Sequence, residues 1–308
     1  MARDHRAAFF RQSISQCAFK TKMVPNVILW PERCGDMKKE ENKMIEMKGI
    51  SKTYRIRKRE AGIGSAVKAL FTRDYTEIHA LKEMSFTIPD GQIVGYIGPN
   101  GAGKSTTIKI LSGILRPDSG ECTVNGMVPW EDRKKYVSKL GVVFGQRSQL
   151  WWDVPVIESF QLLRDIYRVE RGEFQSNLRR LTEQLDLQPF LNAPVRLLSL
   201  GQRMRCEIAA SLLHSPEILF LDEPTIGLDA VSKLKVREFI QSENRERKIT
   251  VILTTHDMQD IDALCHRVLL IGKGQLLLDG SIEEIRAMAG ENLSTEESVA
   301  DLYRRFGI

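Results

Sequence analysis

The chain has few cysteines, and they follow no pattern. Five occur in 308 residues, and none forms the Cys-x-x-Cys spacing of a structural zinc site. Disulfide frameworks are typical of small secreted domains, whereas scattered thiols are typical of reduced compartments. The sequence therefore predicts a reduced cytosolic protein without structural zinc. The five residues are Cys17, Cys34, Cys122, Cys206 and Cys265.

Long apolar segments are also absent. No run approaches the roughly 18 apolar residues that a helix needs to cross a bilayer. The apolar piece from Val27 to Trp30 is too short for the hydrophobic region of a secretory signal. We therefore expect any work in a membrane to require another chain.

The body of the chain lacks an excess of either charge. The formal net charge is +5, but residues 1–44 carry nine Lys and Arg against five Asp and Glu, which leaves 36 against 35 elsewhere. A neutral body argues against nucleic acid as the main partner, because proteins that bind through phosphate contacts usually carry a basic face. For residues 1–44 we expect a disordered extension or a misassigned start codon. A targeting or membrane-surface segment is the alternative.

A glycine-rich segment matches the phosphate-binding loop G-x-x-x-x-G-K-[ST]. It follows a strand-like run, Gln92 to Ile97, and precedes a helical pattern. Three glycines in six residues lose extra entropy on folding, which is hard to explain unless backbone N–H groups must approach a ligand. A helix start favours polyphosphate there, with Lys104 as a cation and Ser105 as a ligand to Mg²⁺. The predicted nucleotide-binding residues are Gly98, Pro99, Asn100, Gly101, Ala102, Gly103, Lys104, Ser105 and Thr106.

Two adjacent acids end a second apolar run. Residues 218–221, Ile-Leu-Phe-Leu, lead directly into Asp222 and Glu223. A buried parallel strand ends in this way when its carboxyl end opens on a ligand site. We expect Asp222 to hold Mg²⁺ opposite Ser105, and Glu223 to orient and deprotonate the water that attacks the γ-phosphorus. The alternative is that both acids only cap the helix after Pro224.

A capped helix start lies between these two motifs. Ser199, with Gln202 three residues later, has the pattern of a capping box, which predicts a helix with an exposed amino end. Such an end is a second anion-binding site. Taken alone, however, the motif is better explained by capping.

The order of these features changes that interpretation. Tyr54 is followed by the phosphate loop, Gln146, the capped helix start, the two acids, Asp229 and His256. From about residue 45 to 285 this order resembles the ATP-binding cassette (ABC) family. The resemblance implies an α/β fold, a P-loop NTPase core of ABC type with a mostly parallel sheet, an antiparallel β subdomain and an inserted α-helical subdomain.

The resemblance also implies roles for single residues. An aromatic residue ahead of the loop stacks on adenine in the family, and Tyr54 occupies the matching position. Gln146 is similar to the glutamine that reaches Mg²⁺ and the attacking water, and His256 to the histidine that contacts the γ-phosphate. Asp229 is similar to the aspartate that communicates between paired sites. The implied catalytic residues are Glu223, His256 and Gln146, and the implied metal ligands are Ser105, Gln146 and Asp222.

A head-to-tail dimer is a further implication. In the family, the signature helix start of one cassette closes over ATP held by the loop of another, so Ser199, Gly201 and Gln202 would act in trans. One set of motifs without an internal repeat predicts two copies of this chain. The family's usual first signature glycine is Leu200 here. If that position needs a positive φ, leucine strains the turn by about 1 kcal/mol or more, which puts rate and affinity in question.

The helical subdomain is expected at about residues 147–200, inside a cassette at 45–285 and ahead of a helical tail at 286–308. Helical patterns at 156–167 and 174–187 are interrupted by Arg171-Gly172 and end at prolines. The subdomain resembles the part of ABC transporters that grips a cytoplasmic helix of the transmembrane subunit. Trp151 and Trp152, just before it, form either the floor of that docking groove or part of the buried subdomain.

Residues 57–79 form an expected insertion that is both basic and apolar. Val67, Leu70 and Phe71 share one face of a helical pattern. We expect this element to touch lipid headgroups or the partner, and a cap on its own domain is the alternative.

The combined features predict the ATP-hydrolysing subunit of an ABC transporter, a dimer on the cytoplasmic face of the cell membrane that powers a separate permease. The signature Leu-Ser-Leu-Gly-Gln and residues 146–153 resemble ATPases of exporters, which favours export. One alternative is a soluble ABC-type ATPase of translation or DNA repair, disfavoured because no second cassette, long coiled coil or zinc module is visible. A module that senses ATP without turnover is disfavoured by Glu223, Gln146 and His256.

Overall fold

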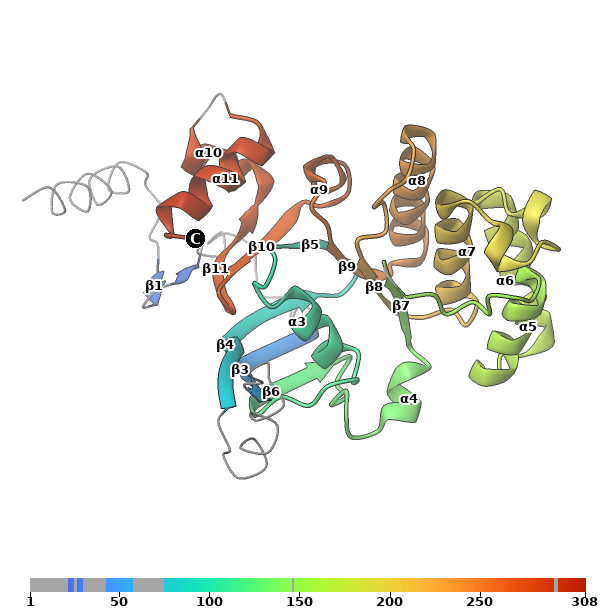
Figure 1. The fold of residues 1–308 in the computed structure, drawn as a ribbon, viewed down its shortest axis with the longest axis horizontal. Coiled ribbons are helices and arrows are strands. Elements are labelled where there is room, and N and C mark those ends of the chain that lie inside the picture. The colour runs from blue at the N-terminus through green and yellow to red at the C-terminus, as the bar shows by residue number, and fades with distance from the viewer. Residues whose placement is uncertain (1–21, 25–26, 30–42, 58–74, 146, 291–292) are drawn as a thin grey trace, which may run out of the picture.

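The strands of the protein form two sheets (Figure 1). The computed structural model describes residues 22–24, 27–29, 43–57, 75–145, 147–290 and 293–308. An eight-stranded sheet has the order β1-β2-β11-β10-β5-β9-β8-β7, and a three-stranded sheet the order β4-β3-β6. The larger sheet consists of β1 (Lys22–Val24), β2 (Val27–Leu29), β5 (Ile93–Ile97), β7 (Leu140–Phe144), β8 (Ile218–Asp222), β9 (Thr250–Thr254), β10 (Arg267–Gly272) and β11 (Gln275–Ser281). The smaller consists of β3 (Lys43–Arg57), β4 (Tyr75–Pro89) and β6 (Ser119–Val124).

Helices separate β5, β7, β8, β9 and β10 of the larger sheet along the chain. The α-helices are α3 (Lys104–Leu111), α4 (Arg133–Val137), α5 (Val156–Tyr167), α6 (Arg171–Gln184), α7 (Leu200–Leu212), α8 (Ala230–Arg247), α9 (Met258–Leu264), α10 (Ile282–Ala289) and α11 (Thr295–Arg305). Two short 3₁₀ helices, η1 (Gln188–Phe190) and η2 (Val195–Leu197), lie between α6 and α7.

The five strands β10, β5, β9, β8 and β7 run parallel to one another. Their side chains are buried on both faces, as in sheets covered by helices on each side. The carboxyl ends of these strands therefore meet at one edge of the sheet. The predicted α/β fold with a mostly parallel sheet is confirmed.

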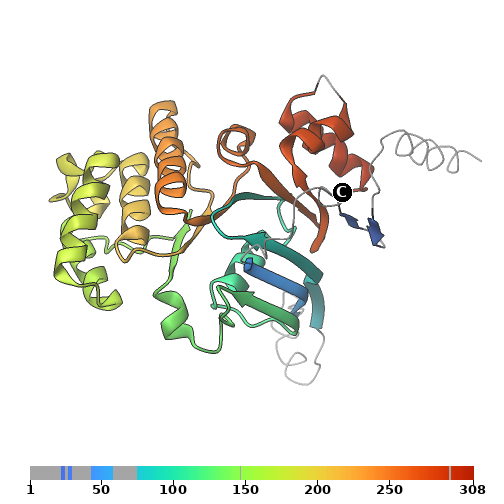
Figure 2. The same cartoon turned by 180° about the vertical axis from the view of Figure 1, so that it is seen from behind.

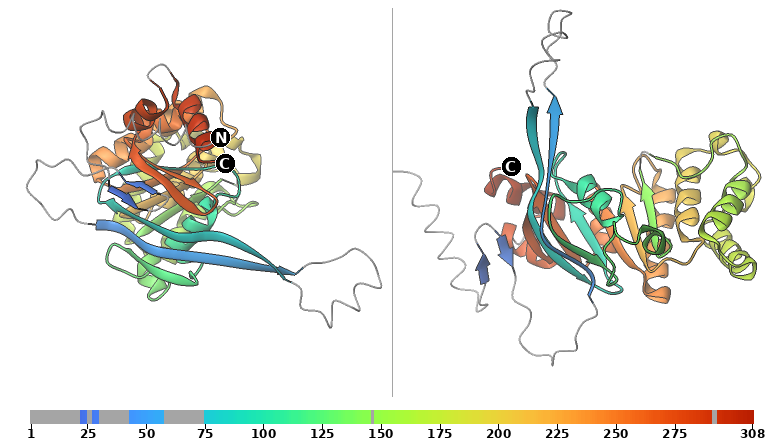
Figure 3. Two further views of the ribbon diagram at one scale, coloured as in Figure 1. Left: turned by 90° about the vertical axis from the view of Figure 1, so that its left-hand side faces the viewer. Right: turned by 90° about the horizontal axis from the view of Figure 1, so that it is seen from below.

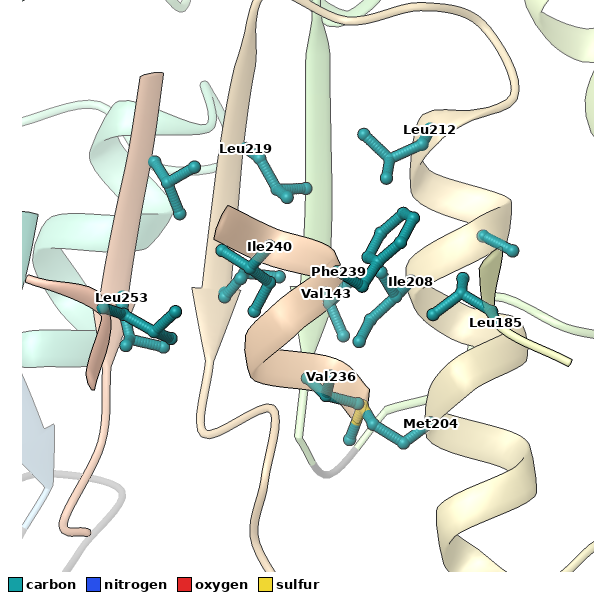
Figure 4. Packing of buried hydrophobic residues seen from close by; sticks show 14 of the residues in the cluster. Val143, Leu185, Met204, Ile208, Leu212, Leu219, Val236, Phe239, Ile240 and Leu253 are labelled. Atoms are coloured by element: carbon teal, nitrogen blue, oxygen red, sulfur yellow. The ribbon is translucent and has the colours of Figure 1, made fainter. Parts of the chain in front are cut away.

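Two apolar clusters cover the opposite faces of this sheet. Val143, Leu219 and Leu253 lie in one cluster with Phe239 and Ile240 of α8, as Figure 4 shows. Alternate residues of the same strands, among them Ile218, Phe220 and Ile252, lie in the other cluster. This alternation follows from the two-residue period of a strand and fixes the register of β8 and β9 between the two layers.

The antiparallel subdomain is built on a long β3–β4 hairpin, and β6 pairs with the other edge of β3. The two hairpin strands pair as far as Arg57 and Tyr75, and they project beyond the body of the molecule (Figure 3). The expected insertion at 57–79 therefore begins and ends in strand. Its middle, 58–74, including Val67, Leu70 and Phe71, lies outside the described residues.

The helices α5, α6 and α7 gather at one end of the molecule (Figure 2). The first runs from Val156 to Tyr167, as its pattern predicts. The expected interruption at Arg171-Gly172 is wrong, because both residues lie in the first turn of α6. The carboxylate of Glu170 caps that turn by accepting from the N–H groups of Gly172 and Glu173. The break lies earlier, at Arg168, which has a φ of 56°.

The first and the last described segments contribute to the larger sheet or its core. Strands β1 and β2 pair with each other, and β2 pairs in parallel with β11. These two strands lie within residues 1–44, the expected N-terminal extension, and β2 extends the sheet beyond β11. Val299 and Leu302 of α11 join the larger apolar cluster. Among the described residues, no helix is long and apolar enough to cross a membrane.

Candidate functional site

The phosphate loop connects β5 to α3. Gly101 and Gly103 have φ values of 80° and 107°, which favour glycine. A Cβ atom on Gly103 would lie 2.6 Å from the carbonyl oxygen of Ala80 in β4. Gly103 is therefore required both by its backbone conformation and by the strand packed behind it. The loop N–H groups stand at the start of α3, where an anion is favoured.

Lys104 is the first residue of α3, and its side chain is buried. Its ammonium donates to the carbonyl oxygens of Gly98 at 2.5 Å and Pro99 at 3.3 Å. Burial lowers the pKa of Lys104, and the negative charges of Glu223 and Asp222 oppose that shift. The lysine predicted for phosphate and the two predicted acids therefore share one electrostatic environment.

Asp222 ends β8, beside Thr254 at the end of the neighbouring strand β9. The hydroxyl of Thr254 donates to Oδ1 of Asp222 at 2.5 Å, which orients the carboxylate. Ser105 is exposed on the first turn of α3. A hydroxyl and a carboxylate oxygen are hard donors that suit Mg²⁺, an ion that keeps waters and takes further ligands from substrate phosphates. Among the described residues, no group of three or more His, Cys, Asp or Glu side chains is arranged to hold a metal ion.

Glu223 leaves the strand in a left-handed conformation, with a φ of 55°. Its N–H donates to the carbonyl of Thr254 at 2.9 Å. Its Oε1 lies 3.0 Å from Nε2 of His256, and the two side chains are 23% and 48% exposed. The turn thus moves the carboxylate out of the sheet and into contact with the predicted histidine at the solvent-facing edge.

Gln146 lies outside the described residues. The preceding residue, Gly145, follows β7 and packs against the two acids. A Cβ atom on Gly145 would lie 2.9 Å from the carbonyl oxygen of Asp222 and 3.5 Å from Cβ of Glu223. The loop after β7 therefore begins at the same edge of the sheet as the acids.

Tyr54 lies on β3, opposite Ile78 of β4, and is partly exposed. Ala80, two residues further along β4, packs against Gly103 of the phosphate loop. The segment before Tyr54 is held by Asp118, which accepts from Thr53 N at 2.7 Å and from Lys52 Nζ at 2.6 Å. The strands thus place the tyrosine in the neighbourhood of the loop.

Ser199 caps α7 in a complete capping box. Its hydroxyl accepts from Gln202 N at 3.2 Å, and its own N–H donates to Gln202 Oε1 at 2.9 Å. Leu200 is the first residue of the helix and is not among the described non-glycine residues with a positive φ. The strain considered for leucine at this signature position is therefore absent.

The signature helix start is remote from the phosphate loop of the same copy. Helix α7 packs on β7, the edge strand, whereas the loop follows β5, three strands away. Asp229 caps α8 by accepting from the N–H and hydroxyl of Ser232 at 2.9 and 2.7 Å. A Cβ atom on Gly201 would lie 2.9 Å from that hydroxyl, so Gly201 and the Asp229 cap are neighbours.

A cavity of about 210 Å³ lies between the loop after β7 and α7. Trp152, Arg203 and the buried Glu207 line it, and the guanidinium of Arg203 lies 5.7 Å from the centre of the Trp152 ring. Trp151 and Trp152 are 40% and 52% exposed, so burial inside the helical subdomain does not explain them.

Three residues around the site were not predicted: Thr254 contacts Asp222, whereas Asp118 and Asp260 contact residues that lie beside predicted ones. Thr254 and Asp118 bind Asp222 and the segment before Tyr54, as described above. Asp260 accepts from residues beside Glu223 and His256. The sequence places Thr254 and Asp260 close to His256, but their contacts with the region of Glu223 depend on the pairing of β8 with β9.

Comparisons with known proteins identify the family of this chain. Residues 81–226 match the family described as ABC transporter. The ABC transporter ATP-binding protein NatA of Bacillus subtilis strain 168 is 33% identical over 208 residues, 68% of this chain and 84% of the relative. The linearmycin resistance ATP-binding protein LnrL of the same strain is 32% identical over 226 residues, 73% of this chain and 72% of the relative. The probable multidrug ABC transporter ATP-binding protein YbhF of Escherichia coli K12 is 33% identical over 223 residues, 72% of this chain and 38% of the relative.

Solved structures show the same fold. One, described as an ATP-binding subunit of an ABC transporter, has a TM-score of 0.70 at 23% identity and covers 84% of this chain and 99% of that one. Another is described as a dimeric post-hydrolysis state of an ATP-binding cassette with ADP and Pi. It has a TM-score of 0.65 at 27% identity and covers 77% of this chain and 98% of that one. The predicted fold class and family are confirmed. The chain belongs to the ABC transporter family, as an ATP-binding subunit that hydrolyses ATP to ADP and phosphate.

Proposed function

We propose that two copies of this chain bind two Mg-ATP molecules head to tail and power a separate permease in export. Each ATP would lie between the phosphate loop of one copy and Ser199, Gly201 and Gln202 of the other. The observation that carries this proposal is the position of α7 on the edge strand β7, three strands from the loop after β5. Within one copy, the helix start is remote from the loop, and a second copy would bring the two motifs together.

In the proposed reaction, Glu223 takes a proton from water as the water oxygen bonds to the γ-phosphorus. The bond between that phosphorus and the bridging oxygen of ADP breaks in line. His256, whose Nε2 lies 3.0 Å from Oε1 of Glu223, would contact the γ-phosphate as well. Lys104 and the N–H groups at the start of α3 bind the phosphates. Ser105, Asp222 and Gln146 would hold Mg²⁺, which would neutralise charge on the phosphate oxygens when bound.

Tyr54 and Asp229 complete the proposed site. Tyr54 would stack on adenine. The packing of its strand pair against the phosphate loop, through Ala80, supports this role. Asp229 is exposed at the start of α8, beside Gly201, from where it reaches the second copy. Both roles rest on the family resemblance and on this placement.

The proposed permease contact is the face around Trp152. Exposed tryptophans and the cavity beside Arg203 offer aromatic and cationic anchors to a helix. The chain would then work at the cytoplasmic face of the membrane. Export is supported by the names of LnrL, a resistance protein, and YbhF, a probable multidrug transporter. We propose an additional contact to lipid or permease at the ends of the β3–β4 hairpin that flank residues 58–74. These strand ends carry the exposed side chains of Ile56 and Ile78.

The variant Glu223→Gln tests this proposal. It keeps the shape of the side chain but removes the base, so we expect turnover to fall about 10²- to 10⁴-fold. ATP binding persists, and ATP should shift the variant from monomer to dimer in size-exclusion chromatography. Glu183→Gln, an exposed change on α6, is the control and should hydrolyse ATP normally. Normal turnover in Glu223→Gln, or no dimer with ATP, would contradict the proposal.

A further inference from the structure

We propose that Asp260 is a positioning residue that holds the proposed catalytic pair Glu223 and His256 in place from behind. This inference rests on the proposed function of that pair. It arises from the buried polar contacts of Asp260 with Thr225, Thr255 and Arg237.

Asp260 lies in α9 and is completely buried. A carboxylate without access to water is stable only when hydrogen bonds and opposite charge satisfy it. Its Oδ2 accepts from the hydroxyls of Thr225 and Thr255, the latter at 3.1 Å. Thr225 lies two residues after Glu223, and Thr255 directly precedes His256. One carboxylate oxygen therefore joins the two segments that carry the catalytic pair.

The other oxygen connects the same group to α8. Oδ1 of Asp260 accepts from Arg237 Nε at 2.6 Å and lies 2.5 Å from a terminal guanidinium nitrogen of the same arginine. Arg237 also lies 3.5 Å from Asp257, which Lys233 contacts at 2.6 Å. The charge of Asp260 is thus balanced by Arg237 of α8, the helix that Asp229 caps, so the group includes a third element.

The backbone conformation of Glu223 requires support from the residues around it. A left-handed glutamate is strained and persists only when its surroundings fix it. Thr254 holds it by accepting from its N–H, and Thr225 holds the chain beyond it through Asp260. Since His256 follows Thr255, the same carboxylate also sets the position of the histidine. Loss of Asp260 should therefore change the alignment of the pair more than the affinity for ATP.

The test is steady-state ATP hydrolysis by Asp260→Asn in the full-length protein. The amide keeps the shape but replaces one accepting oxygen with a donor, which cannot bind the donors that face it. We expect kcat to fall about 10- to 100-fold, while KM for ATP changes less than about threefold. Asp262→Asn, on the same helix α9, is the matched control, because Asp262 is exposed and accepts from Arg286 and Thr295 rather than from Thr225 or Thr255; it should retain kcat.

A second pair of variants keeps the test decisive if Asp260→Asn does not fold. Thr225→Val removes the hydroxyl and should lower kcat, whereas Thr225→Ser keeps the hydroxyl and should restore it. Unchanged kcat in folded Asp260→Asn or in Thr225→Val would overturn the proposal, and so would a loss confined to KM. Glu223→Gln, measured in parallel, separates the two proposals, because normal turnover there would contradict the role of the base itself.

Discussion

The side chain of Leu200 fills the space that a side chain on Gly227 would need. A Cβ atom on Gly227 would lie 2.6 Å from Cδ2 of Leu200, and Gly227 has a φ of 68°. Leu200 starts the signature helix, and Gly227 lies two residues before Asp229. The leucine that departs from the usual family signature therefore contacts the loop that leads to α8.

This contact predicts a coupling between the two positions. Gly227→Ala should destabilise the fold by about 1–3 kcal/mol, through its left-handed backbone and through the clash with Leu200. Leu200→Ala in the same chain removes the clash but not the backbone strain, so the double variant should recover part of the loss. Urea denaturation of both single variants and the double variant measures the coupling. Simple additivity of the two effects would show that the side chains do not compete for this space.

Lys104→Ala should weaken ATP binding itself. Charge-assisted hydrogen bonds to phosphate contribute about 1.5–3 kcal/mol, so the affinity should fall about 10- to 100-fold. Titration with a fluorescent ATP analogue measures this loss directly. Lys109→Ala, on the last turn of the same helix, should bind ATP as the unchanged chain does. Equal affinities for both variants would remove Lys104 from the proposed site.

His214 predicts a dependence of stability on pH. Its Nε2 donates to the carbonyl of Leu140 at 3.0 Å, its ring stacks on Tyr167, and its Nδ1 is buried without a partner. Burial lowers its pKa from 6.5 to about 4. The unfolded chain therefore binds a proton at a higher pH than the folded one, so stability is full above pH 6.5 and falls as the pH drops toward 4. The full shift corresponds to roughly 3 kcal/mol.

The comparison of this chain with His214→Gln isolates that effect. Glutamine can donate to Leu140 but does not titrate, so its stability should change less between about pH 6.5 and 5, above the range of ordinary carboxylates. Urea unfolding at several pH values provides the measurement. Parallel pH profiles for the two proteins would assign the loss to other groups.

Features with a local physical cause could be predicted from the sequence. The phosphate loop needs glycines at Gly101 and Gly103 because of their backbone conformation, and Ser199 and Gln202 cap their helix with their own side chains. Helix α5 likewise follows its apolar spacing. Each of these features depends on residues that are close together in the chain, so one sequence contains the whole signal.

Relations across the sheet could not be predicted in this way. The contact of Thr254 with Asp222 exists because β9 lies beside β8, and the contact of Asp260 with Thr225 follows from the same pairing. The start of α6 at Arg171 was not predicted. Glu170 caps this helix, but the glycine in its first turn, Gly172, suggested a break instead. The pairing of β2 with β11 joins residues that lie far apart in the chain.

The left-handed conformation of Glu223 has a consequence for selection. Strained backbone of this kind costs about 1–3 kcal/mol, and glycine would adopt it with less strain. The variant Glu223→Gly should therefore unfold at a higher temperature, although it lacks the proposed base. A variant library ranked by melting temperature alone would enrich inactive chains at this position. Thermostabilisation of this ATPase therefore has to leave residue 223 unchanged and take its gains from other positions.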